Sequence, residues 1–392
     1  MEPKMKQQLK LSRFLCMLIL VPLAGVGNYV YGQQAAPSAS SSVKGDTFVV
    51  GVRPNDLAID RSGDVWITNK GNGTPGTTLD DSNVTELSNA GNKLGTFVAG
   101  SDPNGIAIDK FGDIWITNSD SNNVTELGPS GKNLGTYAVG NFPVGITVDP
   151  YNNIWVANAG SNNITELDPT GSIIGTFSIP GQGPKYIASF ANGDLCVVET
   201  EATPAMFVIL DNPGPGPKAS YMRPSVLGTY SAGTRPSGLV IGANSSVWVT
   251  NQFNGVGSAI QFNGFARSLS MPMVGRYGTG YMPEGIAMDS SQNVWVASAG
   301  DGSIGLKAAN SKVVEFHFSG GRMQGMTVFT AGTYPQAIAI DQYGDVWVVN
   351  RGNTEQAGTA LGDGNVTKIV GVASGSQYWP YSNQVFPGGG NF

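Results

Sequence analysis

The side chains best suited to binding chemistry each follow one of seven regularly spaced prolines. Six of these prolines lie twelve residues before a tryptophan, and the seventh has the same spacing to Cys196. The residues that follow the prolines are Asn55, Asn104, Val144, Lys185, Ser237, Glu284 and Gln336. The amides, the hydroxyl and the two charged groups can exchange hydrogen bonds with a polar ligand. A hard cation prefers several carboxylates, so the set predicts no cofactor and at most a weakly held divalent cation.

Nucleophilic and acid–base catalysis have few candidate residues in this chain. His317 is its one histidine, and Cys196 occupies a repeat position that otherwise carries tryptophan, which predicts a core side chain. Aspartates recur before tight turns and are expected to cap them; they are Asp60, Asp109, Asp149, Asp289 and Asp341. A second recurring set is expected at solvated or cross-strand polar positions and comprises Glu86, Glu126, Glu166, Glu315 and Lys368. We therefore predict no catalytic residue.

A repeated strand must position these side chains. "GDVWITN" at 63–69 returns in altered form from residues 112, 152, 245, 292 and 344, and successive copies lie 40 to 52 residues apart. A period of this length is typical of propellers and other repeat arrays. Within one copy, short runs rich in β-branched and aromatic residues alternate with turns, which indicates strands. We expect four antiparallel strands per copy, named a to d from the channel outward, which together form one blade.

The number of blades follows from an aromatic residue in strand d. It occurs at Phe48, Phe97, Tyr137, Phe177, Tyr230, Tyr277 and Phe329. Phe48 precedes the first copy, whereas the last copy ends after its third strand. Residues 46–371 therefore predict an all-β, seven-bladed β-propeller in which the N-terminal strand completes the last blade and removes a free edge. A six-bladed ring with one odd copy is the alternative.

The repeat tryptophans are expected to fill the space between blades. In a symmetric a–b pair, Trp115 lies opposite Ala107, with Gly105 diagonal to it on the same face. In the fourth copy the sizes are exchanged, because Cys196 replaces tryptophan and Tyr186 replaces glycine. Since close-packed interiors penalise voids, we interpret this exchange as volume compensation within the core.

The ends of the chain differ from the repeat. A basic head, a short apolar run and small residues predict a secretory signal at 1–32, with an uncleaved anchor as the alternative. A flexible leader is predicted at 33–45 and a C-terminal tail at 372–392. Removing 1–32 takes four of 22 basic and one of 28 acidic side chains, which leaves a net charge of −9. We predict a secreted or periplasmic protein, without a membrane span after signal removal, that binds no nucleic acid.

The motif "PNGIAIDKFGDIWITN" at 103–118 resembles the NHL-repeat propellers, and within them the streptogramin (virginiamycin B) lyase group. The resemblance implies a propeller fold and, for the lyases, histidine and acidic residues with a magnesium ion at the channel mouth. His317 is expected near the turn after strand c, on the opposite face, so the lyase machinery does not carry over. The related gluconolactonase-like propellers hold a divalent ion with acidic and amide side chains, but here the ring has one acid, Glu284.

Departures from the repeat predict where a ligand binds. Strands b and c are joined by long loops at 69–83, 298–311 and 350–365, in blades one, six and seven, which become neighbours when the ring closes. Loops on a rigid scaffold often carry function, so we expect a raised sector on the mouth face. Tolerated surface insertion is the alternative.

The sequence thus favours a monomeric exported binding or scaffold propeller over an enzyme, and leaves an enzymatic role open. Its expected partner is an extracellular or periplasmic protein, a glycan or a small polar ligand, bound on the mouth face. The residues predicted to bind it are Arg53, Asn55, Asn104, Lys185, Tyr281, Glu284, Tyr334 and Gln336. A lyase or lactonase-type enzyme on the same fold is the alternative, because fold does not decide function.

Overall fold

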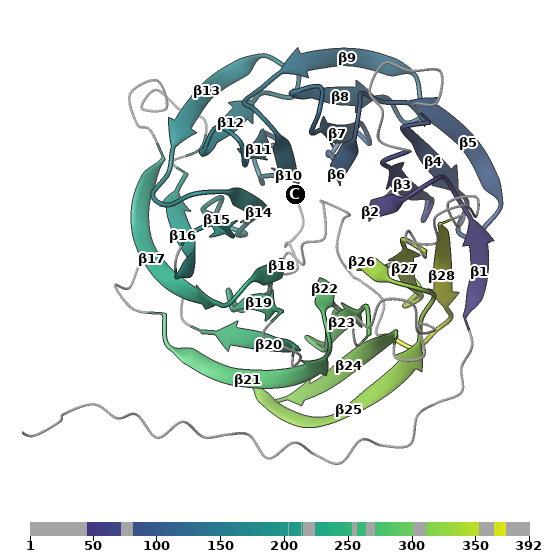
Figure 1. Cartoon of the computed structure of the whole chain (residues 1–392), viewed down its shortest axis with the longest axis vertical. Coiled ribbons are helices and arrows are strands. Elements are labelled where there is room, and N and C mark those ends of the chain that lie inside the picture. Colours follow the sequence, from purple (N-terminus) through teal and green to yellow (C-terminus); the bar gives the residue numbers. More distant parts are fainter. Residues whose placement is uncertain are drawn as a thin grey trace, which may run out of the picture. The chain divides into compact units, whose positions relative to one another are not determined.

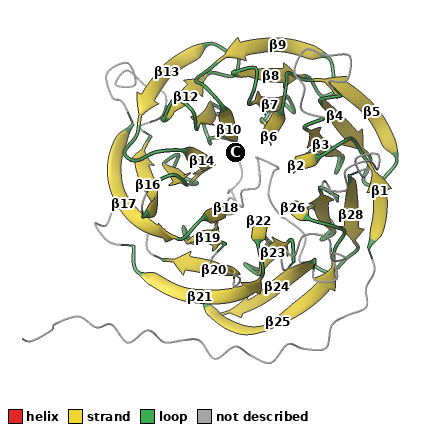
Figure 2. Ribbon diagram, in the orientation of Figure 1, coloured by secondary structure: helices red, strands yellow, loops and turns green. Residues whose placement is uncertain are grey.

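A computed structural model describes residues 45–71, 81–202, 204–212, 214, 224–252, 257–263, 271–300, 311–352 and 364–373. Every regular element in these ranges is a β-strand (Figure 2). A search of the same residues finds no helix with the length and apolar character needed to cross a membrane. The predicted signal, the leader before Gly45, most of the three long loops and the tail from residue 374 lie outside the described residues.

The strands form seven four-stranded antiparallel sheets, numbered here as blades 1 to 7 (Figure 1). Blade 1 contains β2 (Pro54–Ile59), β3 (Val65–Asn69), β4 (Asn83–Leu87) and β5 (Lys93–Val98). Blade 2 contains β6 (Pro103–Ile108), β7 (Ile114–Asn118), β8 (Asn123–Leu127) and β9 (Asn133–Ala138). Blade 3 contains β10 (Pro143–Val148), β11 (Ile154–Asn158), β12 (Asn163–Leu167) and β13 (Ile173–Ser178). Blade 4 contains β14 (Pro184–Ser189), β15 (Leu195–Glu199), β16 (Ala205–Asp211) and β17 (Ser225–Gly233).

The remaining three blades follow the same order. Blade 5 contains β18 (Pro236–Ile241), β19 (Val247–Asn251), β20 (Gly257–Phe262) and β21 (Met273–Gly280). Blade 6 contains β22 (Pro283–Met288), β23 (Val294–Ser298), β24 (Lys312–Ser319) and β25 (Arg322–Thr330). Blade 7 contains β26 (Pro335–Ile340), β27 (Val346–Asn350), β28 (Asn365–Ile369) and β1 (Asp46–Val49). Each repeat proline begins the innermost strand of its blade, so the residues after the prolines lie on the strands next to the central channel (Figure 1).

Ring closure occurs as the sequence predicts. Strand β1 pairs antiparallel with β28, with Phe48 opposite Val366, and the last sheet has the order β1-β28-β27-β26. The N-terminal strand therefore supplies strand d of blade 7, which removes a free edge from that sheet. The seven-bladed prediction is confirmed and the six-bladed alternative is wrong.

The repeat tryptophans are core residues. All six are at most 1% exposed. Trp115 lies opposite Ala107 in the predicted register, and its ring stacks on Tyr137 of strand d with 5.7 Å between ring centroids. The same cluster includes Ile146 and Val148 of blade 3, so each indole both fills its own blade and packs against the next one.

The strand-a glycine of blades 2, 3, 5 and 6 has a different role from the predicted one. A Cβ atom on Gly105 would lie 2.5 Å from the carbonyl oxygen of Val144, in the inner strand of blade 3. The position is therefore restricted by the backbone of the neighbouring blade more than by the indole. Glycine here permits the inner strands to approach one another closely around the channel.

Blade 4 replaces its missing indole with a ring that the sequence did not indicate. Cys196 is fully buried, as predicted, and shares an apolar cluster with Tyr186. The ring that stacks on the strand-d aromatic Tyr230, however, is Phe207 of strand c, at 5.1 Å. Phe207 lies opposite Val198 and is fully buried, so it takes over the stacking of the absent tryptophan.

The recurring aspartates cap the a–b turns as expected. In blade 2, one Asp109 oxygen accepts the backbone N–H groups of Phe111 at 2.8 Å and Asp113 at 3.0 Å. In blade 3, the indole N–H of Trp155 also donates to the Asp149 carboxylate, at 3.0 Å. These contacts combine turn formation with placement of the buried indole.

The recurring glutamates lie at cross-strand positions, which is one of the two predicted alternatives, and they are not solvated. Each is paired directly opposite the tryptophan of strand b, as Glu86 is with Trp66, and therefore lies on the face buried between blades. Glu86 is 9% exposed and Glu315 is 4% exposed. Burial raises the pKa of Glu86 to about 7 and that of Glu315 to about 8, and nearby aspartates add to both shifts.

Candidate functional site

The channel mouth is the face that carries the seven d–a turns, and an unusual backbone conformation shapes it. The residue before each repeat proline has a positive φ: 52° for Arg53, 54° for Asp102, 50° for Phe142, 64° for Gly183, 50° for Arg235, 45° for Met282 and 53° for Tyr334. This conformation costs roughly 1–2 kcal/mol for each residue other than glycine. Hydrogen bonds to the end of strand b hold it, such as Lys70 N to Arg53 O at 3.1 Å. The rim side chains therefore project from fixed backbone positions.

Two of the predicted ligand-binding residues bind each other. The Asn55 amide nitrogen donates to the Asn104 side-chain oxygen at 3.0 Å and to its backbone oxygen at 3.3 Å. The Asn104 amide in turn donates to Ser119 at 3.0 Å. Because these groups already satisfy one another, we assign Asn55 and Asn104 to the contact between blades 1 and 2.

A charged and aromatic cluster lies where blades 4 and 6 face the channel. The Lys185 ammonium lies 5.2 Å from the centroid of the Tyr186 ring, and the two groups shift each other's pKa. Glu284 of β22 accepts a hydrogen bond from Gln252 at 2.6 Å. All three side chains of the cluster, Lys185, Tyr186 and Glu284, are partly exposed, so a ligand entering the channel can reach them.

The environment of Glu284 brings its titration into the neutral range. Burial raises the pKa of Glu284 to about 7, although Lys185, the Gln252 hydrogen bond and the charges of Arg351 and Arg235 all oppose that shift. Burial also raises the pKa of Tyr186. At neutral pH the Glu284 carboxyl is therefore present in both protonation states, whereas the Tyr186 hydroxyl remains protonated.

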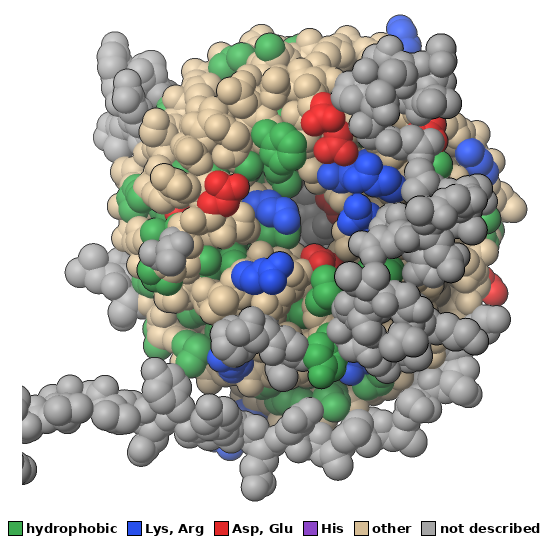
Figure 3. Space-filling model, viewed as in Figure 1, with side chains coloured by type: hydrophobic (Ala, Val, Ile, Leu, Met, Phe, Trp, Pro, Cys, Tyr) green, Lys and Arg blue, Asp and Glu red, His purple; other side chains and the backbone are tan. Residues whose placement is uncertain are grey.

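Positive charge gathers around the channel mouth. Figure 3 shows Lys and Arg side chains around a central hollow, with fewer acidic side chains between them. The charges of Arg235 and Arg351 act on Glu284, and those of Arg53 and Arg351 act on Lys70, whose pKa burial lowers. Lys70 forms a 3.4 Å ion pair with Asp102. An acidic chain thus presents a local basic surface, which attracts anions.

The other predicted residues line the rim without forming one compact site. Tyr281 is 44% exposed. Tyr334 and Gln336 are partly exposed on either side of Pro335. One guanidinium nitrogen of Arg53 donates to the Gly71 carbonyl at 3.4 Å. The raised sector predicted over these residues lies mostly outside the described ones.

Sequence reasoning missed four contributors to the mouth. Tyr186 had been assigned to the core alone, although its ring also lies beside the Lys185 ammonium. Gln252, Arg235 and Arg351 lie next to the ends of strands, and the sequence alone gives no sign that they share the environment of Glu284. One usable signal was that blade 4 has a tyrosine on its innermost strand where blades 2, 3, 5 and 6 have a glycine.

The described part of the mouth has no cluster of metal ligands. Among the described residues, the one group of three acidic side chains close enough to share an ion is Asp60, Asp64 and Glu86, at the a–b turn on the opposite face. His317 contacts Thr327 at 2.7 Å and Glu315 at 3.4 Å near the c–d turn of blade 6, as its position in the repeat predicts. The described side chains of the mouth are thus suited to bind an anion through Lys185 or to exchange a proton through Glu284, whose pKa is near 7.

Comparison with known proteins supports the fold. No protein-family model and no curated protein matches this chain. A catalytically inactive virginiamycin B lyase from Staphylococcus aureus, solved with quinupristin, is 15% identical with a TM-score of 0.58, covering 83% of this chain and 99% of the lyase. The chain shares the propeller fold of the streptogramin B lyases. The fold predicted from the resemblance is thus confirmed.

Other solved structures are equally similar and do different things. Hydrazine synthase from Kuenenia stuttgartiensis is 14% identical with a TM-score of 0.62, covering 86% of this chain and 100% of that one. The Pan2 WD40 domain from Neurospora crassa is 9% identical with a TM-score of 0.59, covering 85% and 97%. At these identities the likeness describes the fold, and function must be argued from the site.

Proposed function

We propose that this protein is an exported binding propeller whose channel mouth takes up a polar ligand that carries an acidic group. The observation behind the proposal is the Lys185–Tyr186–Glu284 cluster, enclosed by the positive charges of Arg235 and Arg351. A partly buried lysine makes charge-assisted hydrogen bonds to a carboxylate or sulfate, and these are stronger than neutral ones. A glycan with acidic sugars and a small organic acid both fit this chemistry.

Glu284 makes the proposed binding sensitive to pH. When protonated, it can donate a hydrogen bond to an acidic ligand, and when ionised it repels the same ligand. Its pKa is raised to about 7. An anionic ligand therefore binds the protonated form more tightly, and its affinity increases as the pH falls from 8 to 6.

A lyase or lactonase-type enzyme is the second candidate, because the same cluster has acid–base capacity. A carboxyl with a pKa near neutrality beside an ammonium and a phenol is suited to proton transfer. Solved streptogramin B lyases share the fold. Turnover of a cyclic lactone peptide that disappears in Glu284→Gln would favour this candidate over binding alone.

The test is calorimetric titration of the full-length chain with glucuronic acid, galacturonic acid and their neutral parents glucose and galactose. We expect the acids to bind at the mouth, and Lys185→Gln to weaken them at least tenfold, which corresponds to about 1.4 kcal/mol. Lys132→Gln, at an exposed turn remote from the channel, is the matched control and should leave the affinity unchanged. Equal loss in both variants, or no preference for the acids, would contradict the proposal.

A further inference from the structure

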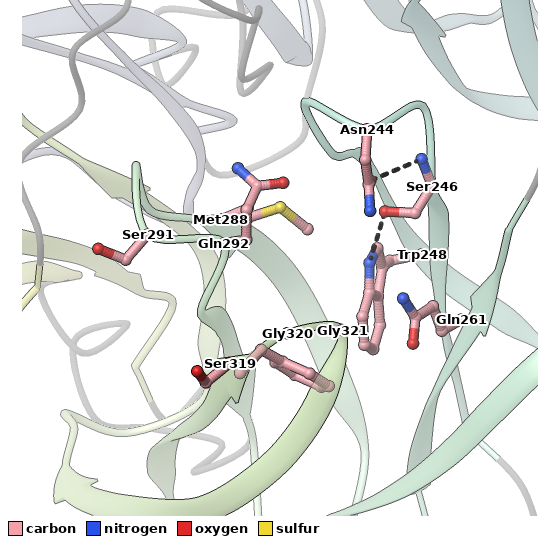
Figure 4. Close-up of a pocket in the computed structure, with 11 residues that line it drawn as sticks. Asn244, Ser246, Trp248, Gln261, Met288, Ser291, Gln292, Ser319, Gly320 and Gly321 are labelled. Atoms are coloured by element: carbon pink, nitrogen blue, oxygen red, sulfur yellow. Dashed lines mark hydrogen bonds between the residues drawn. The ribbon is translucent and has the colours of Figure 1, made fainter.

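A second recess lies between blades 5 and 6, on the face of the a–b turns opposite the channel mouth (Figure 4). Its volume is about 150 Å³, and its lining combines the a–b turns of both blades with the c–d turn of blade 6. None of the described residues that line it carries a charge. The recess shares no residue with the mouth, so it requires its own explanation.

Blade 5 creates one wall because it has lost the acidic positions of the repeat. Gly242, Ser246 and Gln261 occupy positions where blade 1 carries two aspartates and a glutamate. The Trp248 indole N–H therefore donates to the Ser246 hydroxyl oxygen, at 3.2 Å. The aspartate cap of blades 1, 2, 3, 6 and 7 is here replaced by a smaller and neutral surface.

Blade 6 creates the opposite wall with an extended c–d hairpin. Strand β24 has eight residues and β25 has nine, whereas their counterparts β12 and β13 in blade 3 have five and six. The longer hairpin places the partly exposed Phe318 edge-on against Trp248, at 5.2 Å and 70°. Its tip, Gly320–Gly321, has positive φ values, and an added Cβ there would meet nothing within 4 Å.

The polar groups of the recess are arranged as donors. The Asn244 side-chain oxygen accepts the Ser246 N–H at 3.0 Å, which leaves its amide N–H₂ for a ligand. The Gln292 oxygen accepts the Ala243 N–H at 3.1 Å, which leaves its own amide nitrogen. The Ser246 oxygen accepts from the indole, so its hydroxyl proton remains to be donated. Figure 4 shows Gln292 and Asn244 on opposite sides of the recess.

We propose that this recess binds one neutral, hydroxyl-rich ring, such as a terminal sugar residue. A cavity of about 150 Å³ holds benzene, and the six-membered ring of a pyranose has the same number of ring atoms. Uncharged amides and hydroxyls that surround an aromatic ring match a ligand with an apolar face and neutral hydroxyl acceptors at its edge. The absence of charge from the lining distinguishes this ligand from the acidic one proposed for the mouth.

The experiment uses saturation-transfer NMR on the full-length chain with glucose, galactose, mannose and N-acetylglucosamine as probes. We expect saturable binding of at least one sugar in the millimolar range, as small ligands with few contacts show. Ser319→Trp places a large side chain at the exposed rim of the recess and should weaken that binding at least tenfold. Thr170→Trp, at the exposed c–d turn of blade 3, is the matched control and should leave it unchanged.

A second variant keeps the test valid if Ser319→Trp does not fold. Gln292→Ala removes one amide without adding volume and should weaken the same sugar at least threefold. Lys185→Gln separates the two sites, because it should weaken acidic ligands at the mouth and leave neutral-sugar binding unchanged. Absence of binding by all four sugars, or equal weakening by Ser319→Trp and Thr170→Trp, would overturn the proposal.

Discussion

Blades 2 and 4 have the same four-stranded order but use their central positions differently. In blade 2, Trp115 stacks on Tyr137, and the Asn118 side chain accepts from Gly100 N at 2.9 Å. The Asn118 amide also donates to Asn123 at 2.8 Å and Thr125 at 2.9 Å. This asparagine therefore ties strand c to the turn that leads into its own blade.

Blade 4 lacks this hydrogen-bond network. Glu199 replaces the asparagine, and its strand-c neighbours are Met206 and Val208 in place of the asparagine and threonine. Both Glu199 oxygens are buried and have no hydrogen-bond partner among the described residues, and burial raises the pKa of Glu199 to about 7. The polar side chains that distinguish blade 4 lie instead on its inner strand, at Lys185 and Tyr186.

The difference separates two kinds of repeat position. An aromatic stack in every blade is required by the fold, because blade 4 keeps one by using Phe207 after losing its tryptophan. The glycine on strand a and the asparagine on strand b are replaceable, and blade 4 replaces both. We infer that the irregular blade gives up a structural hydrogen-bond network and gains the charged cluster at the channel.

The largest expected effect is on the aromatic stack. Phe207→Ala and Trp115→Ala should each lower the free energy of unfolding by about 3–5 kcal/mol, because each empties a buried ring site. Chemical denaturation measures both values. Leu134→Ala, at a side chain that is 47% exposed, is the control, and we expect it to cost less than about 1 kcal/mol.

A rescue experiment sharpens this comparison. Cys196→Trp alone should overpack blade 4 and cost about 1–3 kcal/mol. In the Phe207→Ala background the same change should recover part of the lost stability, since the indole can enter the emptied space. Strict additivity of the two changes would show that the residues do not share one space.

A smaller effect on the free energy of unfolding is expected from substitutions of Asn118 in blade 2 and Glu199 in blade 4, which occupy the same repeat position. Asn118→Leu should cost about 1–3 kcal/mol, because it leaves Gly100 N and the strand-c side chains without a partner. Glu199→Leu at pH 7 should be neutral or stabilising, because the carboxyl it removes is buried and has no partner to lose. Denaturation of the two variants side by side measures the difference. Equal destabilisation by the two substitutions would contradict the interpretation of blade 4.

The pH dependence of the same pair follows from the raised pKa of Glu199. Its folded-state pKa is about 7, above the ordinary value near 4.3, so between these values the folded chain binds more protons than the unfolded one. Its contribution to stability is therefore complete below about pH 4 and is lost as the pH rises to 7, by at most about 1.4 kcal/mol per pH unit. The stability gained by Glu199→Leu over the wild type should grow across this window and level off above it.

Local pattern was sufficient to predict the fold. The twelve-residue spacing from proline to tryptophan marked each blade, and Phe48 marked the strand that closes the ring. Phe207 was missed because strand c of blade 4 carries none of the repeat motif. The positive φ values before proline were also missed, since a residue before proline usually favours an extended backbone. In the structure, the backbone oxygen of each of these residues accepts a hydrogen bond from the residue after strand b, which stabilises the positive φ value.

The site was less predictable than the fold. Lys185 and Glu284 lie on innermost strands, as their place after a repeat proline predicts, but their common environment with Arg235 and Arg351 depends on how the blades are arranged around the ring. Asn55 and Asn104 were also predicted because each follows a repeat proline, and in the structure they form a hydrogen bond with each other. The position after the proline identifies the strand that lies next to the channel. The hydrogen-bond partners of its side chains, however, belong to other blades that are distant in sequence.

The most direct test of the central claim, that the charged cluster at the channel binds an acidic ligand, is the affinity of glucuronic acid measured by calorimetry from pH 5.5 to 8.5. Glucuronic acid stays ionised over this range, so the account predicts that affinity falls as the pH rises through about 7, where Glu284 loses its proton. Glu284→Gln should abolish this dependence while keeping the binding, and Lys185→Gln should weaken binding at every pH. A pH profile that is unchanged in Glu284→Gln, or full affinity in Lys185→Gln, would contradict the account.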